Sequence, residues 1–227
     1  MMRDIYLIIG ALNEEVDALL KRMENIESLE YQGVSYYTGK LSGQNCVLAL
    51  SGVGKVNAAY TTTVLTGMFD VCEIINIGSA GGLDVNQNVG DLVIADELKY
   101  HDLDFGNAPV DERYFFYPKT HDFEKVLIQL GLPYHKGLIV SGDQFVMKDS
   151  DAFKNIQLKF PSAIAVEMEA TAVAAVAKKR GIPCIVLRAL SDVTHHDDND
   201  LVFEDYLVLA SENSAKLCSA YMESRTP

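Results

Sequence analysis

The chain has 227 residues, of which 48% are hydrophobic, with a formal net charge of −13 at pH 7 and a pI near 4.7. This acidic balance argues against nucleic acid or an anionic membrane as a partner, because both carry negative charge themselves. No apolar run approaches the length needed to cross a bilayer or to form a secretory leader. The four cysteines lack metal-ligand spacing and predict reduced thiols, so we expect a soluble, cytoplasmic protein.

Strand-like and helix-like segments alternate from end to end of the chain. Short apolar runs bounded by turn residues predict strands at residues 5–12, 31–41, 46–50, 73–77, 91–95, 137–140, 164–166 and 184–187. Apolar residues at helical spacing predict helices at residues 14–23, 170–180 and 203–223, and from the glycine turn at 51–54 to residue 69. This order is typical of a single α/β domain, residues 1–227, with a largely parallel or mixed sheet covered on both faces.

Residues 103–120 form the least regular stretch, which is rich in Asp, Asn, Pro and aromatic residues. A long irregular stretch in a compact domain is commonly a binding loop or an interface. A surface excursion that packs its own aromatic side chains explains the composition equally well, and both interpretations stay open.

Two carboxylates, Glu167 and Glu169, lie inside an otherwise apolar run at residues 163–176. Burying a carboxylate is costly unless something binds it, so this run is a candidate for chemistry. The pattern changes there from strand to helix, and Gly181 after the basic residues 178–180 is typical of a helix end. The two carboxylates are therefore expected at a strand-to-helix junction, where an open α/β sheet usually binds its ligand.

Glycines or acids follow other predicted strands as well. Glu14 and Glu15 follow the first strand, where the simplest interpretation is a helix N-terminus stabilised by acidic residues. The turn at residues 51–55 only superficially suggests a phosphate loop, because it lacks the GxxxxGK[ST] spacing. Small residues at 76–82 would let a ligand approach the backbone, but they do not form the GxGxxG fingerprint. Neither glycine turn therefore predicts a nucleotide cofactor.

The last predicted strand leads into a polar segment, residues 188–192, which begins with Arg188. This arginine would lower the pKa of nearby carboxylates and orient them, and a structural Arg–Asp pair is an equal alternative. The adjacent His195 and His196 lack further spaced ligands, so we interpret them as part of a solvated acidic loop rather than a metal site. What remains is a set of carboxylates and hydroxyls at strand ends without a cofactor or metal motif. Such a set suits cleavage of a glycosidic bond.

Seven segments carry a more specific signal: Ile9-Gly-Ala-Leu-Asn-Glu-Glu-Val16, Ser51-Gly-Val-Gly-Lys55, Asn76-Ile-Gly-Ser-Ala-Gly-Gly82, Val89-Gly-Asp-Leu-Val93, Gly137-Leu-Ile-Val-Ser-Gly-Asp143, Ala165-Val-Glu-Met-Glu-Ala170 and Arg188-Ala-Leu-Ser-Asp192. Each is weak alone. Together and in this order they resemble the 5′-methylthioadenosine/S-adenosylhomocysteine nucleosidases of the purine nucleoside phosphorylase superfamily, over nearly the whole chain. The resemblance implies an α/β fold, a three-layer α/β/α arrangement with a central mixed, largely parallel twisted sheet. It also implies hydrolysis of the adenine–ribose bond without a cofactor or metal.

The resemblance further implies roles for individual residues. Glu15 would hold and activate the attacking water, with help from Ser79 and Arg188. Asp192, beside Ser191, would be the general acid that lets adenine leave as a neutral base. An Asp that acts as an acid near neutral pH needs a raised pKa, so Asp192 is expected to be the perturbed carboxyl.

Glu169 would accept hydrogen bonds from the ribose hydroxyls. The other implied substrate-binding positions are Met168 under the sugar, Glu167 nearby, Phe145 and Val146 against the adenine, and Leu12 and Phe203 along the alkylthio side. The division of roles is physically reasonable, because ribosyl-cation character in the transition state is stabilised by carboxylates in a water-excluding pocket.

Alternatives on the same fold are a nucleoside phosphorylase, an aminodeoxyfutalosine hydrolase and a non-catalytic nucleoside-binding protein. Glu15 argues against phosphorolysis because a carboxylate repels phosphate, and the presence of Glu15, Glu169 and Asp192 argues against mere binding. The chain departs from the family pattern at residues 103–114, which shape the 5′ pocket and the dimer contact in the family. The preference among methylthioadenosine, S-adenosylhomocysteine, 5′-deoxyadenosine and aminodeoxyfutalosine therefore stays open. A homodimer and a place in methionine salvage are implied by the resemblance.

Overall fold

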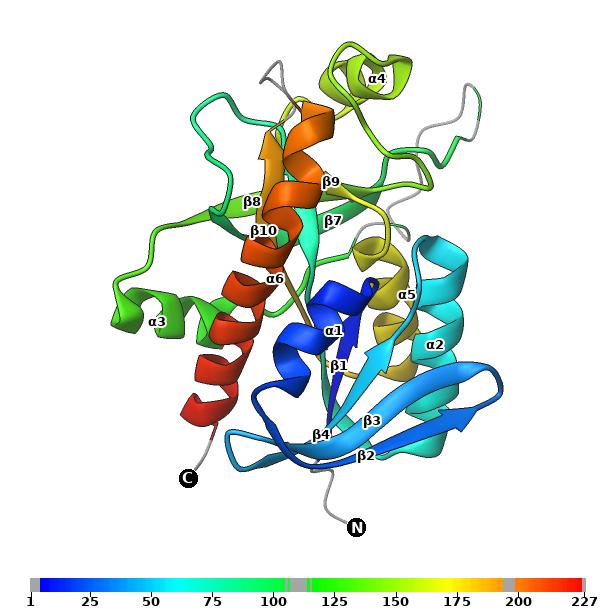
Figure 1. Cartoon of the computed structure of the whole chain (residues 1–227). Helices are drawn as coiled ribbons and strands as arrows, with labels where there is room; N and C mark the ends of the chain where they lie inside the picture. The colour runs from blue at the N-terminus through cyan, green and yellow to red at the C-terminus, as the bar shows by residue number, and fades with distance from the viewer. Residues whose placement is uncertain (1–4, 105, 107–113, 115, 194–198, 226–227) are drawn as a thin grey trace.

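The computed structural model describes residues 5–104, 106, 114, 116–193 and 199–225, and of residues 199–205 it describes the backbone only. The strands are β1 (Ile5–Gly10), β2 (Met23–Tyr31), β3 (Val34–Leu41), β4 (Gln44–Leu50), β5 (Val71–Asn76), β6 (Ser79–Gly82), β7 (Leu92–Tyr100), β8 (Tyr134–Ser141), β9 (Ala163–Glu167) and β10 (Cys184–Val193). The helices are α1 (Asn13–Leu20), α2 (Lys55–Met68), α3 (His121–Leu130), α4 (Asp151–Lys159), α5 (Ala170–Arg180) and α6 (Asn199–Ser224). Together they form the mixed α/β fold of Figure 1.

The described strands form a single 10-stranded sheet in the order β2-β3-β4-β1-β5-β10-β6-β9-β8-β7. Pairing is parallel along β4-β1-β5-β10 and along β7-β8-β9, and antiparallel along β2-β3-β4. β6 runs parallel to β10 and antiparallel to β9, and β7 runs antiparallel to β10. Because of this last pairing, strands β6 to β10 close on themselves, whereas β1 to β5 form an open sheet.

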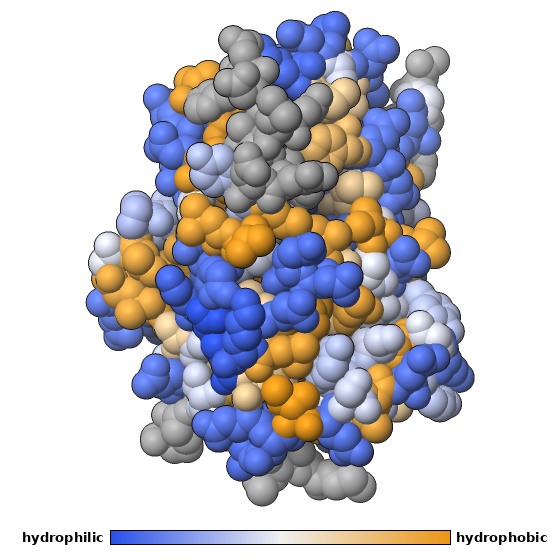
Figure 2. Space-filling model, in the orientation of Figure 1, coloured by the Kyte–Doolittle hydropathy of each residue, from blue (hydrophilic) through white to orange (hydrophobic). Residues whose placement is uncertain are grey.

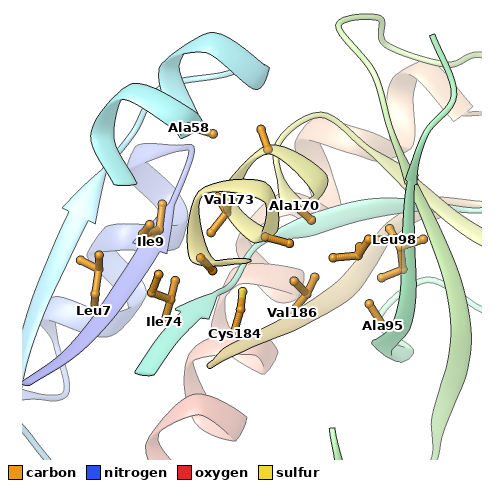
Figure 3. Close-up of a cluster of buried hydrophobic side chains, with 14 of the residues drawn as sticks. Leu7, Ile9, Ala58, Ile74, Ala95, Leu98, Ala170, Val173, Cys184 and Val186 are labelled. Atoms are coloured by element: carbon orange, nitrogen blue, oxygen red, sulfur yellow. The ribbon is translucent and has the colours of Figure 1, made fainter. Parts of the chain in front are cut away.

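Hydrophobic side chains cover both faces of the open part of the sheet. Successive residues of a strand point to opposite faces, so Leu7 and Ile9 of β1 pack with α2 and α5. Tyr6 and Ile8 of the same strand pack with α1, α3 and α6. Figure 3 shows the first cluster, in which Ala58 of α2 faces α5. Small side chains there let the two helices pack closely over the sheet.

Strand β10 is buried along its whole length and connects the open part of the sheet to the closed part. The expectation that this strand ends at Leu187 is wrong, because it continues to Val193 and includes Arg188 and Asp192. Polar side chains are tolerated inside a buried strand when they form hydrogen bonds within the protein. Arg188, for example, donates to Glu167 at 2.6 Å.

A local irregularity in β10 changes the direction of its polar residues. Leu190 pairs with Ala80 and Asp192 pairs with Gly81, so Ser191 is an extra residue in the ladder. Such a β-bulge redirects side chains and is frequent next to functional sites. Here it brings both Ser191 and Asp192 to the wall of one cavity.

The other sequence expectations agree with the structure to different degrees. The predicted hairpin is formed by β3 and β4, with Ser42 and Gly43, both at positive φ, in its turn. The helix expected at residues 14–23 ends at Leu20, because β2 begins at Met23. The sequence patterns did not predict β2, β6, α3 or α4. All four cysteines are free, and three of them are buried, as expected.

The irregular stretch at 103–120 is described only in part, because residues 105, 107–113 and 115 lie outside the described residues. His195 and His196 also lie outside them. Near the end of the stretch, Phe116 is buried, exchanges backbone hydrogen bonds of 2.8 and 3.1 Å with Leu98, and contacts the Tyr100 ring edge-on. At this end, the stretch packs an aromatic side chain into the core.

No described helix is both long and apolar enough to span a bilayer. Figure 2 shows a surface on which hydrophilic side chains surround smaller hydrophobic patches, one of them over α3. In this helix Ile128 and Leu130 are exposed, while Phe123 and Leu127 are buried against the sheet. α3 therefore presents apolar side chains to solvent as well as to the core.

Candidate active site

A cavity of about 370 Å³ opens at the carboxyl ends of β1, β4, β5, β8 and β9, the edge where α/β sheets usually bind ligands. It is lined by all of the predicted site residues whose side chains are described: Leu12, Glu15, Ser79, Phe145, Val146, Glu167, Met168, Glu169, Arg188, Ser191 and Asp192. Phe203 lies in α6, in the stretch where the backbone alone is described. The structure thus brings residues from distant segments together around one cavity.

The sequence patterns missed some residues of the lining, notably Val53 and Gln144. Val53 lies in the glycine turn after β4, and Gln144 lies directly before Phe145 in the loop after β8. The available signal was their position, since turns that follow parallel strands meet at the same edge of a sheet.

Glu15 both caps the start of α1 and lines the cavity. Its Oε2 accepts the backbone N–H groups of Ala11 at 2.7 Å and Leu12 at 3.1 Å, which caps the start of α1. Its Oε1 accepts from Ser79, at 3.0 Å from the backbone N and 3.3 Å from Oγ. Burial raises the pKa of Glu15, while the charge of Arg188 and these N–H groups act in the opposite direction. The carboxyl is therefore a stronger base than an exposed Glu would be.

Glycines let the turn before β6 and β6 itself approach the acidic side chains. A Cβ on Gly78 would lie 2.8 Å from Glu15 Oε1, and a Cβ on Gly81 would lie 3.0 Å from Asp192 Oδ2. Real Cβ atoms rarely come so close to an oxygen without displacing it. The small residues at 76–82 thus permit close approach, as expected, but the groups that approach are the protein's own carboxylates.

Glu167, like Glu15, has both of its carboxylate oxygens bonded within the protein. Its Oε2 accepts from Arg188 Nη2 at 2.6 Å and from the backbone N–H groups of Glu169 at 2.9 Å and Ala170 at 2.8 Å. Its Oε1 accepts from the hydroxyl of Ser141. Both side chains of the ion pair with Arg188 are almost fully buried. Glu167 therefore joins β8, β9, β10 and the start of α5.

Replacing Glu167 with Ala should lower the free energy of unfolding by about 3–5 kcal/mol, because Arg188 would remain buried without its charge partner. Urea unfolding followed by circular dichroism measures the change. Lys136→Ala is the control: it removes a partly exposed ion pair with Glu124, and should cost at most about 1 kcal/mol. Equal losses for the two variants would contradict the expectation.

Arg188 is held from several sides by groups of the protein. Its Nη1 donates to the carbonyl oxygens of Asn76 at 3.1 Å and Leu187 at 2.9 Å. Its Nη2 donates to Asn76 Oδ1 and Glu167 Oε2, both at 2.6 Å. Its Nε is buried without a partner among the described residues. Arg188 as a residue also lines the cavity, so its guanidinium lies beside the space that a small molecule would fill.

Asp192 and Ser191 form a buried pair on the bulge of β10. Ser191 Oγ donates to Asp192 Oδ1 at 2.9 Å and also lies 3.4 Å from the carbonyl oxygen of Ala80. Asp192 is only 2% exposed. The serine restricts the rotation of the Asp192 carboxyl, so this acid has a fixed orientation toward the cavity that it lines.

Glu169 lies at the N-terminus of α5, and its Oε1 accepts the backbone N–H of Gly54 at 2.8 Å. Burial, and next the charge of Glu167, raise the pKa of Glu169 to about 8, against the opposing effects of the Gly54 N–H and Arg188. A carboxyl with this pKa is largely protonated at neutral pH in the unliganded protein. It can then both donate and accept hydrogen bonds.

The raised pKa of Glu169 should make stability depend on pH. A carboxyl whose pKa rises from 4.5 to about 8 on folding binds its proton more tightly in the folded state. Its contribution to the free energy of unfolding is therefore fully present below pH 4.5 and is lost as the pH rises through 8. Glu169→Gln should flatten the fall in stability over this range, as measured by urea unfolding at a series of pH values. Glu14→Gln, on the exposed side of α1, should keep the wild-type slope, and equal slopes in all three proteins would contradict the raised pKa.

The remaining lining is mostly apolar. Leu12, Val146 and Met168 contribute hydrophobic surface, and Phe145, at the mouth of the cavity, is 49% exposed. Within the described part of the chain, no group of His, Cys, Asp and Glu side chains has the arrangement of a metal site. The cavity therefore pairs an apolar wall with a few convergent acidic groups, as ligand sites for small molecules commonly do.

Comparison with known proteins agrees with this geometry. Residues 5–223 match the family model of the phosphorylase superfamily. A 5′-methylthioadenosine/S-adenosylhomocysteine nucleosidase of Halalkalibacterium halodurans is 38% identical over 224 residues, which cover 94% of this chain and 95% of the relative. A nucleosidase of the same name from Staphylococcus aureus strain JH9 is 39% identical over 222 residues, covering 94% and 96%.

A solved structure also matches the fold of this chain over nearly its whole length. The nucleosidase of Neisseria meningitidis, in complex with methylthio-immucillin-A, has a TM-score of 0.89 and 35% identity to this chain. The match covers 97% of this chain and 99% of that one. Fold and family model together define a member of the phosphorylase superfamily. Within that superfamily, the chain belongs to the 5′-methylthioadenosine/S-adenosylhomocysteine nucleosidases.

Proposed function

We propose that the protein hydrolyses the bond between adenine and ribose in 5′-methylthioadenosine and S-adenosylhomocysteine, releasing adenine. The observation that carries the proposal is the convergence of Glu15, Glu169 and Asp192 on one cavity. Cleavage of this bond passes through a transition state with ribosyl-cation character, which carboxylates in a water-excluding site stabilise. The relatives of the chain are named for this activity.

The attacking water is held by Glu15, Ser79 and Arg188. Ser79 Oγ and Glu15 Oε1 are 3.3 Å apart, and Arg188 offers the Nε that has no partner among the described residues. The water attacks C1′ of the ribose as the bond to adenine breaks, and its proton passes to Glu15. The raised pKa of Glu15 favours this transfer.

Asp192 donates a proton to the adenine ring, so that the base leaves neutral rather than as an anion. The hydrogen bond from Ser191 fixes the orientation of this carboxyl. That Asp192 carries the proton at neutral pH stays a prediction. The proton balance closes, because Glu15 gains the proton that the water loses and Asp192 loses the proton that adenine gains.

The rest of the cavity binds the substrate. Glu169 contacts the ribose hydroxyls, with Met168 under the sugar. Phe145 and Val146 contact the adenine, and Leu12 lines the 5′ side, to which the family resemblance also assigns Phe203. Glu167 lies nearby in the same lining and holds Arg188 and the start of α5 through hydrogen bonds to both of its oxygens.

Phosphorolysis on the same site is disfavoured by charge. Among the described residues that line the cavity, Arg188 is the only Lys or Arg. Both of its Nη atoms already donate to Asn76 and other protein groups. Phosphate needs free cationic or N–H donors, and Glu15 would repel it.

The proposal also covers the domain architecture, the cellular compartment and the oligomeric state. It comprises one domain with a three-layer α/β/α arrangement and a largely parallel sheet, acting in the cytoplasm, where the four free cysteines stay reduced. It also includes a homodimer. Val56 is 78% exposed and Tyr60 is 50% exposed on one side of α2, close in sequence to Val53 of the cavity lining. A second copy that covered this side of α2 would bury both side chains.

The test of the proposed function is adenine release from methylthioadenosine, measured with and without added phosphate, with the sugar product identified by mass spectrometry. Free methylthioribose at a rate independent of phosphate supports the proposal, whereas a sugar phosphate overturns it in favour of a phosphorylase. The same assay on S-adenosylhomocysteine, 5′-deoxyadenosine and aminodeoxyfutalosine ranks the 5′ substituents. Absence of adenine release from every substrate would leave a binding protein.

A further inference from the structure

Three charged residues outside the cavity lining, Lys55, Asp102 and Asp143, form what we call the Lys55 cluster. Lys55 Nζ donates to both carboxylate oxygens of Asp102 at 2.6 Å and lies 3.5 Å from Asp143 Oδ2. The backbone N–H of Asp143 donates to Asp102 Oδ2 at 2.9 Å. The backbone N–H of Lys55 donates to Asp143 Oδ1 at 2.8 Å. The cluster therefore joins the start of α2 to the loops that follow β7 and β8.

Two of the joined segments carry groups of the cavity. Gly54, directly before Lys55, donates its N–H to Glu169 at 2.8 Å. Gln144 and Phe145, directly after Asp143, line the cavity. The N-terminus of α2 thus binds two acidic side chains, that of Glu169 through the N–H of Gly54 and that of Asp143 through the N–H of Lys55.

The contact between the two segments is close. Gly54 has φ +96°, and a Cβ on it would lie 3.2 Å from Asp143 Oδ1. Only glycine adopts this backbone conformation readily, so the turn is built to bring its N–H groups to both carboxylates. A shift of the loop after β8 would therefore also move the N–H that Glu169 accepts.

Within the cluster, Lys55 and Asp102 are partly shielded from solvent, whereas the side chain of Asp143 is 48% exposed. The side chains of Lys55 and Asp102 are only 23% and 21% exposed. Burial raises the pKa of Asp102, but the hydrogen bonds from Lys55 and from the backbone of Asp143 outweigh it and hold this pKa below its usual value. The pair is thus charged at neutral pH, and such a shielded pair is screened less by salt than a surface pair.

We propose that Lys55, Asp102 and Asp143 are positioning residues for the reaction, which hold the adenine-facing loop and the N–H that orients Glu169 at a fixed separation. This inference rests on the proposed function, and nothing in the cluster needs to touch the substrate. The adenine-facing loop and the start of α2 are therefore held together by ion pairs and hydrogen bonds. We expect loss of these contacts to lower ligand affinity as well as stability.

The first experiment compares Lys55→Met with the wild-type protein by calorimetric titration of adenine and by steady-state hydrolysis of methylthioadenosine. Loss of the cluster should raise the adenine Kd and the KM about tenfold, with a smaller fall in kcat, because small misplacements of binding groups weaken oriented contacts. Lys55→Arg should restore most of the affinity, since a guanidinium can bind both carboxylates.

Lys136→Met is the matched control. It removes an ion pair of 3.0 Å whose side chains are 33% and 22% exposed, close to the exposures of the Lys55–Asp102 pair. Neither Lys136 nor its partner Glu124 lines the cavity. This variant should keep the wild-type adenine Kd and KM, even if its melting temperature falls slightly.

A second variant makes the test independent of Lys55. Asp143→Asn keeps an oxygen that can accept the Lys55 N–H but removes the charge, so it should raise the adenine Kd less than Asp143→Ala does. An unchanged adenine Kd in Lys55→Met and in Asp143→Ala, with only a lower melting temperature, would overturn the proposal and leave a purely structural cluster.

A wild-type protein that binds adenine but hydrolyses no substrate would instead overturn the proposed function. The adenine titrations would still decide the role of the cluster.

Discussion

Asp192→Asn should lower kcat for methylthioadenosine by about 10³-fold, because a positioned general acid typically contributes 10²–10⁴-fold. An amide cannot donate the proton that adenine needs in order to leave as a neutral base. It keeps an oxygen that can accept the hydrogen bond from Ser191, so the side chain should keep its orientation in a site where Asp192 is 2% exposed. Fold and adenine affinity should therefore change little.

Single-turnover kinetics and adenine titration separate these effects for Asp192→Asn. Asp17→Asn, an exposed residue of α1, controls for the loss of one negative charge and should keep the wild-type kcat. If Asp192→Asn retained a kcat within tenfold of wild type, adenine would have to obtain its proton from another group. A large loss of adenine affinity would point instead to a binding role for Asp192.

The parts of the fold that the sequence predicts well are those with continuous apolar runs. β1 and β4 are buried central strands whose apolar residues follow one another without polar interruption, and in β5 only Glu73 interrupts the apolar run before Asn76. The helix at 170–180 is predicted from its helical spacing and from Gly181, which adopts the left-handed conformation at its C-terminus. In these segments, local preference and burial agree.

The missed strands are those in which pairing, rather than pattern, decides the structure. β2 is an edge strand whose Glu24, Glu27 and Glu30 are exposed, so it has no apolar face to recognise. Its backbone is nevertheless paired with β3 over most of its length. β6 consists of Ser79–Gly82, a composition typical of a turn, and becomes a strand because it pairs with β9 and β10.

In the candidate site, too, the local sequence predicts some features, and contacts with distant segments decide the others. The sequence identifies Glu167 and Glu169 as a pair but cannot tell them apart, because both lie in the same apolar run. The difference comes from distant segments, since Ser141 and Arg188 occupy the oxygens of Glu167, whereas Gly54 binds Glu169. Likewise, nothing local to Lys55 reveals its contacts, because their carboxylates lie 47 and 88 residues further along the chain.

Glu15→Gln should reduce hydrolysis of methylthioadenosine by about 10³-fold, at the level expected for the loss of a general base. Each carboxylate oxygen of Glu15 accepts from backbone N–H groups, Oε2 from Ala11 and Leu12 and Oε1 from Ser79. An amide has one acceptor oxygen and one NH₂ group, so in either orientation the NH₂ group faces an N–H donor. The variant thus loses both the base and the geometry that holds the water.

Glu14→Gln is the matched control for Glu15→Gln, because it makes the same change on the preceding residue, whose side chain is exposed, and should keep the wild-type rate. Hydrolysis at a near-normal rate by Glu15→Gln would contradict the role of Glu15 in activating water.

The same variant separates two reasons why phosphate should not replace water as the attacking group. If repulsion by Glu15 were the only barrier, Glu15→Gln would gain phosphate-dependent cleavage. Because the Nη atoms of Arg188 stay bonded to Asn76 and Glu167, we expect no such gain, and a phosphate titration of adenine release measures it.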